Sequence, residues 1–177
     1  MKDSDPVIDL SLSPLDARIV GRDRSFFADD LTAAGAELAG IIGGARILFI
    51  GAAGSIGFQT LRTVAHFRPR VLHVVDHNEN GLAEVVRALR SAADPLVVEE
   101  LLTLPLDYGS DTFRLWLAQQ AQGYDLVLNF AALKHVRSEK DPYSILAMLD
   151  TNVLKLERLA RQIRNQPGLK RLFCVST

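Results

Sequence analysis

The chain has 177 residues, of which 48% are hydrophobic and 23% are charged, a composition that suits one compact domain and argues against a disordered segment. Its 20 basic and 21 acidic residues leave a formal net charge of -1, so no electrostatic argument favours nucleic acid as a partner. The single cysteine, Cys174, excludes an internal disulfide and a multi-thiolate site, and the four histidines lack ligand spacing, so no metal is predicted.

The sequence also bears on location. The first residues lack the basic and apolar regions of a secretion signal. The apolar runs fall short of the roughly 20 residues that a membrane helix needs. We therefore predict a cytoplasmic protein with no membrane partner.

Residues 1–44 show no alternation typical of strands and are predicted to form an N-terminal arm with one helix. That helix is predicted from about Asp30 to Ile42, where Asp29 and Asp30 suit the positive helix N-terminus. Apolar residues recur there at helical spacing, at Leu31, Ala34, Leu38 and Ile41.

Residues 45–177 are predicted to form the main domain, because short apolar runs alternate there with amphipathic helices. Five strands are predicted, at 46–50, 71–75, a run ending near 106–107, 126–130 and 172–175. Helices are predicted over 55–67, after residue 80, over 110–123 and over 141–165. This pattern predicts an α/β fold of the Rossmann type, a doubly wound parallel sheet with strand order 3-2-1-4-5.

The clearest motif is GAAGSIG at residues 51–57, directly after the first strand and at the start of a helix. Gly51 permits a tight turn, Gly54 lets backbone amides approach a pyrophosphate, and Gly57 lets the helix pack close to the sheet. The helix N-terminus would then attract the anion. No Gly-Lys-Ser/Thr follows, which excludes a Walker-type loop. The alternative is a glycine-rich turn that binds nothing.

Asp76 ends the second strand, where a carboxylate can accept hydrogen bonds from ribose hydroxyls. It would repel a 2′-phosphate, and no arginine follows immediately, so NAD is favoured over NADP. NADP stays possible because Arg87 or Arg90 on the next helix could reach a phosphate. The alternative interpretation of Asp76 is a solvated helix cap.

Further segments carry a family resemblance. The fourth strand runs into NFAALKHV at residues 129–136, followed by DP at 141–142, TNV at 151–153 and VST at 175–177. Together with the glycine loop, which resembles that of extended short-chain dehydrogenases/reductases, they resemble the nucleotide-sugar 4,6-dehydratases of the polysaccharide-biosynthesis family, above all the UDP-N-acetylglucosamine 4,6-dehydratase type. The resemblance covers roughly residues 21–177.

The resemblance implies a bound NAD(P) and assigns residues to it. The pyrophosphate would be held by Gly51, Gly54, Ser55, Ile56 and Gly57. The adenosine ribose would contact Asp76, and the adenine would be bordered by Asp107 and Tyr108. The middle of the cofactor would be lined by Ala131, Ala132 and Lys134.

Some of these polar residues allow a structural interpretation. Asp107 equally suits a strand-end cap. Lys134 could be a solvated surface charge, although a lysine just past the carboxyl end of a strand points to the ligand crevice of an α/β sheet. His135 is interpreted as a packed structural residue.

Asn152 lies on the apolar stripe of the predicted long helix. That stripe also holds Ile145, Met148, Leu149, Leu156 and Leu159. A buried amide without partners costs about 1–3 kcal/mol, so Asn152 should be hydrogen-bonded internally. By resemblance it would organise the catalytic region, but a purely structural tie explains it as well.

By resemblance, the reaction would remove hydride from C4 of a UDP-N-acetylglucosamine-like sugar, eliminate water across C5 and C6, and return the hydride to C6. Thr177 matches the catalytic hydroxyl residue near the C4 hydroxyl. The family's next residues, an Asp-Lys pair, are not present, and no Tyr-x-x-x-Lys pair replaces them. We therefore predict the cofactor-binding portion of a longer, homo-oligomeric dehydratase, inactive by itself.

Two other functions agree with part of this pattern. The chain could be a non-catalytic dinucleotide-binding or sensing module. An S-adenosylmethionine methyltransferase shares a glycine loop and an acid after the second strand, but its loop normally lacks the three-residue glycine period found here.

Overall fold

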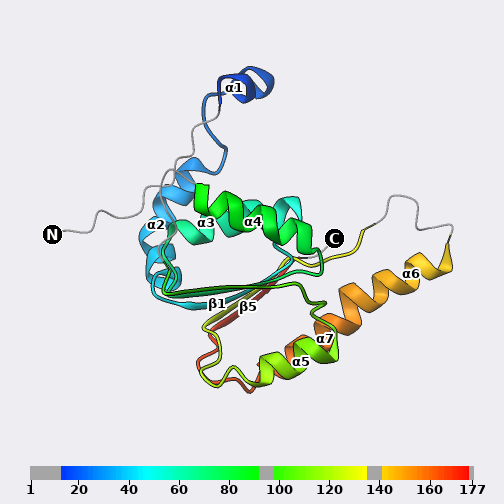
Figure 1. The fold of residues 1–177 in the computed structure, drawn as a ribbon. Coiled ribbons are helices and arrows are strands. Elements are labelled where there is room, and N and C mark those ends of the chain that lie inside the picture. The colour runs from blue at the N-terminus through cyan, green and yellow to red at the C-terminus, as the bar shows by residue number, and fades with distance from the viewer. Residues whose placement is uncertain (1–12, 92–97, 135–140, 176–177) are drawn as a thin grey trace.

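The computed structural model describes residues 13–91, 98–134 and 141–175. Its centre is a parallel sheet in the order β3-β2-β1-β4-β5 (Figure 1). The strands are β1 (Arg46–Ile50), β2 (Val71–Val75), β3 (Glu100–Leu104), β4 (Leu126–Asn129) and β5 (Arg171–Cys174). The predicted Rossmann-type fold and strand order are confirmed.

The carboxyl ends of the inner strands lie at one edge of the sheet. Ile50 at the end of β1 pairs with Val75 of β2 and with Asn129 of β4, and Val75 pairs with Leu104 of β3. β2 is buried throughout and β1 from Ile47 onward, which is why both segments are almost continuously apolar. The loops that leave these strands therefore meet in one place.

Helices cover both faces of the sheet (Figure 1). One face packs against α3 (Ser55–His66) and α4 (Glu79–Ser91) through a cluster that includes Phe49, Leu61 and Leu82. The other face packs against α5 (Asp111–Ala118) and α7 (Lys155–Ile163) through a second cluster that includes Leu48, Phe113 and Leu159. Fully burying each such side chain stabilises the folded chain by about 1.5–3 kcal/mol relative to leaving it exposed.

Two predicted elements, one strand and one helix, end several residues before the pattern indicated. β3 stops at Leu104, so the residues up to 107 leave the sheet. α5 stops at Ala118 rather than near Gly123, and Ala121 is exposed instead of facing inward. The reason is packing: the chain must turn early to bring Tyr124, 1% exposed, into the core.

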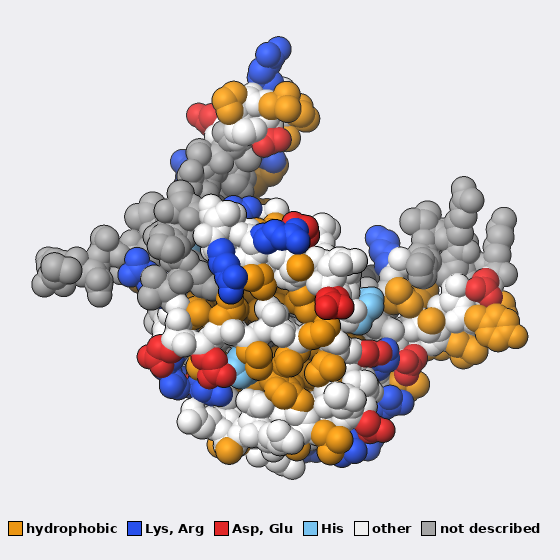
Figure 2. All heavy atoms as spheres, viewed as in Figure 1, with side chains coloured by type: hydrophobic (Ala, Val, Ile, Leu, Met, Phe, Trp, Pro, Cys, Tyr) orange, Lys and Arg blue, Asp and Glu red, His pale blue; other side chains and the backbone are white. Residues whose placement is uncertain are grey.

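The predicted long helix is interrupted. It consists of α6 (Pro142–Leu149), a π-helical segment η2 (Asp150–Leu154) and α7. The backbone amide of Lys155 donates to the carbonyl of Asp150, five residues earlier, which is the π pattern. The first half of the predicted apolar stripe is not buried: Ile145 is 43% and Leu149 is 49% exposed. Figure 2 shows hydrophobic side chains gathered over α6 at the right of the view.

The described part of the N-terminal arm, residues 13–44, contains two helices, whereas one was predicted. α2 (Ala28–Ile42) corresponds to the predicted helix and packs Leu38, Ile41 and Ile42 against the core on the α3/α4 face. A short helix, α1 (Pro14–Val20), precedes it, with Ser13 as its N-cap; in the described part of the chain none of its residues is buried. The boundary predicted at residue 45 stays a prediction. Of the helices in the described ranges, none is long and apolar enough to cross a membrane.

Candidate functional site

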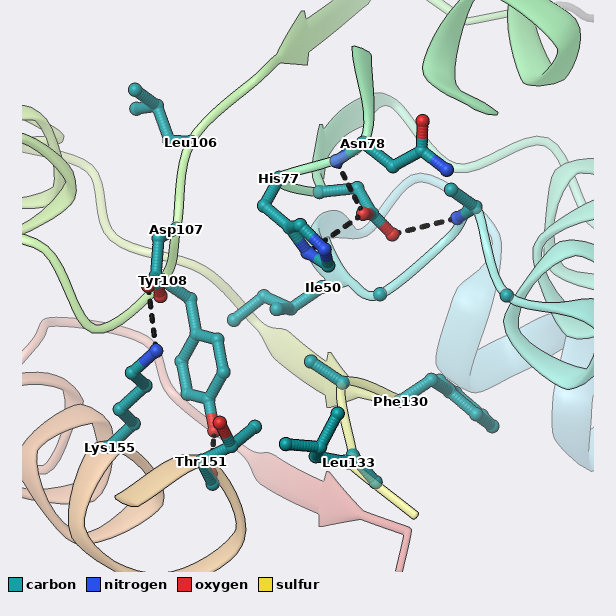
Figure 3. A pocket seen from close by; sticks show the side chains of 16 residues that line it. Ile50, His77, Asn78, Leu106, Asp107, Tyr108, Phe130, Leu133, Thr151 and Lys155 are labelled. Atoms are coloured by element: carbon teal, nitrogen blue, oxygen red, sulfur yellow. Dashed lines mark hydrogen bonds and ion pairs between the residues drawn. The ribbon is translucent and has the colours of Figure 1, made fainter. Parts of the chain in front are cut away.

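A cavity of about 390 Å³ opens where the carboxyl ends of the inner strands meet. It is lined by the loops after β1, β2, β3 and β4, and by Thr151 and Lys155 near the start of α7 (Figure 3). This volume lies in the usual range of small-molecule sites. β1 lies between β2 and β4, where successive connections lead to opposite sides, and open α/β sheets bind their ligands at that point.

Two glycines of the GAAGSIG loop are required by the packing of the chain. Gly51 has φ +84°, and a Cβ there would lie 2.4 Å from the amide nitrogen of Ala131. A Cβ on Gly57 would lie 2.0 Å from the carbonyl oxygen of Gly51. Gly54 differs, because the nearest atom to its Cβ position would be that same oxygen at an ordinary 3.7 Å. Gly54 also lines the cavity, so its missing side chain leaves room for a ligand.

The N-terminus of α3 adjoins this open position. Gly54 is the N-cap residue, and within the described residues no side chain caps the helix. Its first-turn amides therefore present a partial positive charge. Ser55 and Ile56 are exposed; neither of them nor Gly57 is among the described residues that line the cavity.

Asp76 ties the glycine loop to the end of β2. Its side chain is 7% exposed, and its Oδ2 accepts a hydrogen bond of 2.9 Å from the amide of Ala53. Its Oδ1 accepts one of 2.9 Å from the amide of Asn78, and Nδ1 of His77 lies 3.4 Å from the same oxygen. Asp76 is thus buried and bonded to loop amides, which differs from the solvated helix cap of the alternative interpretation, and it lines the cavity in a fixed orientation.

Asp107 stands on the opposite side of the cavity. Its Oδ1 accepts from the amide of Gly109 at 2.8 Å, and its Oδ2 accepts from Nζ of Lys155 at 2.6 Å (Figure 3). Partial burial raises the pKa of the Asp107 carboxyl, but the hydrogen bonds from Lys155 and Gly109 outweigh it, so the pKa lies below its ordinary value. The carboxylate is therefore charged at neutral pH.

Tyr108 is buried beside Asp107, and its hydroxyl donates to the carbonyl oxygen of Thr151 in η2. Burial raises the pKa of this phenol to about 12, so it stays a hydrogen-bond donor at neutral pH. The contact connects the loop after β3 to the π-helical segment (Figure 3).

The loop after β4 is held by the amide side chain of Asn152. Its Oδ1 accepts from the amide of Leu133 at 2.8 Å, and its Nδ2 donates to the carbonyl of Leu133 at 2.9 Å. The predicted internal hydrogen bonding of Asn152 is therefore confirmed. Leu133 lines the cavity with Ala131 and Ala132.

The remaining predicted site residues lie apart from this cavity or outside the described ranges. Lys134 is exposed and is not among the described residues that line the cavity. His135 and Thr177 lie outside the described residues.

Sequence analysis missed several lining residues. His77 and Asn78 directly follow Asp76. They could have been predicted by counting the two residues after it as part of the cavity wall. Thr151 belongs to the TNV segment of the resemblance, but neither it nor Lys155 could be placed at the cavity, because the π segment changes which side of the helix each residue occupies.

The fold and this site define a Rossmann-type α/β protein. The family model described as "Polysaccharide biosynthesis protein" matches residues 47–177, well over half of the chain, so the chain belongs to that family. A curated relative, an uncharacterized membrane protein of Methanocaldococcus jannaschii, is 29% identical over 132 residues, which cover 74% of this chain and 35% of the relative. The chain thus spans about a third of that relative's length.

Solved structures share the fold at low sequence identity. A short chain dehydrogenase from Shigella flexneri aligns with TM-score 0.60 and 20% identity, over 77% of this chain and 56% of that one. Pen from Bacillus thuringiensis aligns with TM-score 0.59 and 21% identity, over 74% and 37%. WbmF from Bordetella bronchiseptica, crystallised with NAD+, aligns with TM-score 0.56 and 19% identity, over 75% and 36%.

Proposed function

We propose that the chain binds NAD(P) in this cavity and serves as the cofactor-binding portion of a nucleotide-sugar-modifying enzyme. The observation that carries the proposal is the open position at Gly54 beside the uncapped N-terminus of α3. A pyrophosphate fits the donor set there, because it is anionic and needs close approach to backbone amides. The fold neighbours support the same class of ligand, since WbmF was crystallised with NAD+ and a putative short chain dehydrogenase of Escherichia coli with NADPH.

The proposed roles follow the walls of the cavity. The pyrophosphate would lie against the backbone of Gly51, Gly54, Ser55, Ile56 and Gly57. Asp76 would accept hydrogen bonds from the ribose hydroxyls, and Asp107 and Tyr108 would border the adenine. Ala131 and Ala132 would flank the middle of the cofactor, and Lys134 would contact it from the rim, where its exposed side chain has room to move.

NAD is the proposed cofactor in preference to NADP. Asp76 is almost fully buried and is held by two amides, so it cannot swing away from an added 2′-phosphate. Such a phosphate would meet a carboxylate at short range. On α4, Arg87 pairs with Glu84, so the guanidinium of Arg87 is less available to bind a 2′-phosphate.

The finer proposal is a 4,6-dehydratase acting on a UDP-N-acetylglucosamine-like sugar. When bound, the cofactor would take hydride from C4 and return it to C6 after water has left across C5 and C6. Thr177 is proposed to hydrogen-bond the C4 hydroxyl. The family match supports a role in polysaccharide biosynthesis, with which a nucleotide-sugar dehydratase is compatible. The alternative, a non-catalytic dinucleotide-binding module, is supported by the cavity alone.

Calorimetry with NAD, NADP and S-adenosylmethionine tests the proposal. We expect binding of NAD, weaker binding of NADP and none of S-adenosylmethionine. Gly54→Ala should weaken NAD binding roughly tenfold or more, because a methyl group would displace the pyrophosphate from charge-assisted hydrogen bonds. Gly35→Ala on α2, where a Cβ meets nothing within 4 Å, is the matched control.

If the wild-type chain binds neither NAD nor NADP, the proposed function is wrong. An assay for a 4-keto sugar separates the dehydratase from the binding module. It is run on this polypeptide and on a longer one that continues through an Asp-Lys pair to the full length of the solved relatives. Activity that appears only with the longer chain would support the dehydratase, and no activity in either would support the binding module.

A further inference from the structure

Lys155 is the charged residue of the cavity that no sequence motif indicated. It begins α7, directly after the π segment, and its side chain is 16% exposed. Its Nζ lies 2.6 Å from Oδ2 of Asp107 and 3.6 Å from Oδ2 of Asp150. The aliphatic stem lies against Gly109, because a Cβ on that glycine would come within 2.4 Å of Cγ and Cδ of Lys155. The packed stem thus holds the ammonium group of Lys155 at the wall of the cavity.

This contact fixes the orientation of the Asp107 carboxylate. One oxygen accepts from Lys155 and the other from the amide of Gly109, so neither can rotate without losing a hydrogen bond. Each carboxylate oxygen can accept a second hydrogen bond. Asp107 lines the cavity and is 44% exposed, so these remaining acceptor positions are accessible to a ligand.

An ionised carboxylate only accepts hydrogen bonds, so it distinguishes ligand groups by chemistry. It favours an exocyclic amine and disfavours a carbonyl oxygen at the same place, because two acceptors repel each other. A protonated or rotated side chain would lose that distinction. An aspartate this exposed is ionised at neutral pH in any case, so what Lys155 prevents is rotation, because its ammonium holds one carboxylate oxygen in place.

We propose that Lys155 is a positioning residue that makes the cavity selective for a 6-aminopurine over a 6-oxopurine, by holding Asp107 as a fixed acceptor. The proposal rests on the proposed function, because it concerns the base of the dinucleotide bound there. Asp150 does not need Lys155 in the same way, since Arg158 lies 4.0 Å from its other oxygen.

The test compares the affinity for NAD with that for nicotinamide hypoxanthine dinucleotide, which carries an oxygen in place of the amine. We expect the wild-type chain to prefer NAD roughly tenfold or more, the usual effect of mismatching a hydrogen bond to a charged group. Lys155→Met keeps the stem against Gly109 but removes the charge, and should lower this preference at least about threefold. Lys155→Arg should restore part of it.

Two further variants make the ratio interpretable. Asp107→Asn replaces the carboxylate by an amide that can also donate, so it should abolish the preference or reverse it. Arg158→Met removes a charge from the same helix without touching Asp107, and should leave the ratio unchanged. Any general loss of attraction for a diphosphate affects both ligands equally and cancels in the ratio.

The outcomes separate this inference from the function on which it rests. A wild-type chain that binds both dinucleotides equally, or a Lys155→Met variant with the wild-type ratio, overturns the role of Lys155 while dinucleotide binding stands. A wild-type chain that binds neither dinucleotide overturns both. A ratio that falls in Lys155→Met and Asp107→Asn but not in Arg158→Met supports the assignment.

Discussion

The two walls of the cavity are built in different ways. On the glycine-loop side, backbone amides make the contacts: Gly51 donates to the carbonyl of Val75, and Ala53 donates to Asp76, 23 residues away. On the opposite side, side chains make them, from Tyr108 to Thr151 and from Lys155 to Asp107, across 43 and 48 residues. Where two backbone segments touch, as Gly51 touches Ala131, there is no room for an added atom, whereas a wall made of side chains can lose one contact and keep its shape.

This difference predicts the largest effect for Gly51→Ala. The substitution places a Cβ 2.4 Å from the amide nitrogen of Ala131 and forces a residue with a side chain to φ +84°. We expect the free energy of unfolding to fall by about 3 kcal/mol, because strain and overpacking add. Urea denaturation measures it, with Gly54→Ala as control, which should stay within about 0.5 kcal/mol of wild type. Equal stability of the two variants would show that the close backbone contact at Gly51 does not limit this wall.

A smaller loss is expected for Asn152→Ala, which tests the tie between η2 and the loop after β4. The variant leaves both the amide and the carbonyl of Leu133 without their side-chain partner. We expect a decrease of about 2 kcal/mol in the free energy of unfolding. Asn165→Ala, an exposed asparagine in the turn after α7, is the matched control in the same denaturation experiment. If both variants lose the same stability, the hydrogen bonds of Asn152 contribute little.

The smallest expected effect on stability comes from the protonation of His73, which lies on β2 and is 1% exposed. Its Nε2 lies 2.9 Å from a carboxylate oxygen of Glu100 and therefore carries the proton, so Nδ1 accepts from the hydroxyl of Tyr124 at 2.7 Å. Burial lowers the pKa of His73 below 6.5, against a smaller opposite influence of Glu100. The buried imidazole is thus neutral in the folded chain.

The sign of the pH dependence follows from this pKa. Above about pH 6.5 both the folded and the unfolded chain hold His73 neutral, so stability does not change through this group. As the pH falls below that value, the unfolded chain binds the proton first and stability decreases. Denaturation midpoints between pH 8 and pH 5 should therefore fall more steeply in wild type than in His73→Gln. Parallel curves would contradict the assignment.

Much of the fold was predictable because its signals are local. β1 and β2 have the predicted bounds, since strands buried on both faces must be apolar throughout. The glycine spacing placed Gly51 at a positive φ and Gly57 against the loop for the same local reason. The end of α5 was not predictable, because it depends on where Tyr124 meets His73, on a strand 51 residues away.

The sequence by itself determined which segments form most of the strands and helices, and where a glycine-rich turn lies at the cavity, because hydrophobic period and backbone freedom act over a few residues. The tertiary structure alone decided that η2 interrupts a long helix and that Lys155 reaches Asp107. Those features depend on which distant groups meet once the helices pack on the sheet. The hydrogen bond from Tyr108 to Thr151 of η2, and those between Asn152 of η2 and Leu133, exist only then.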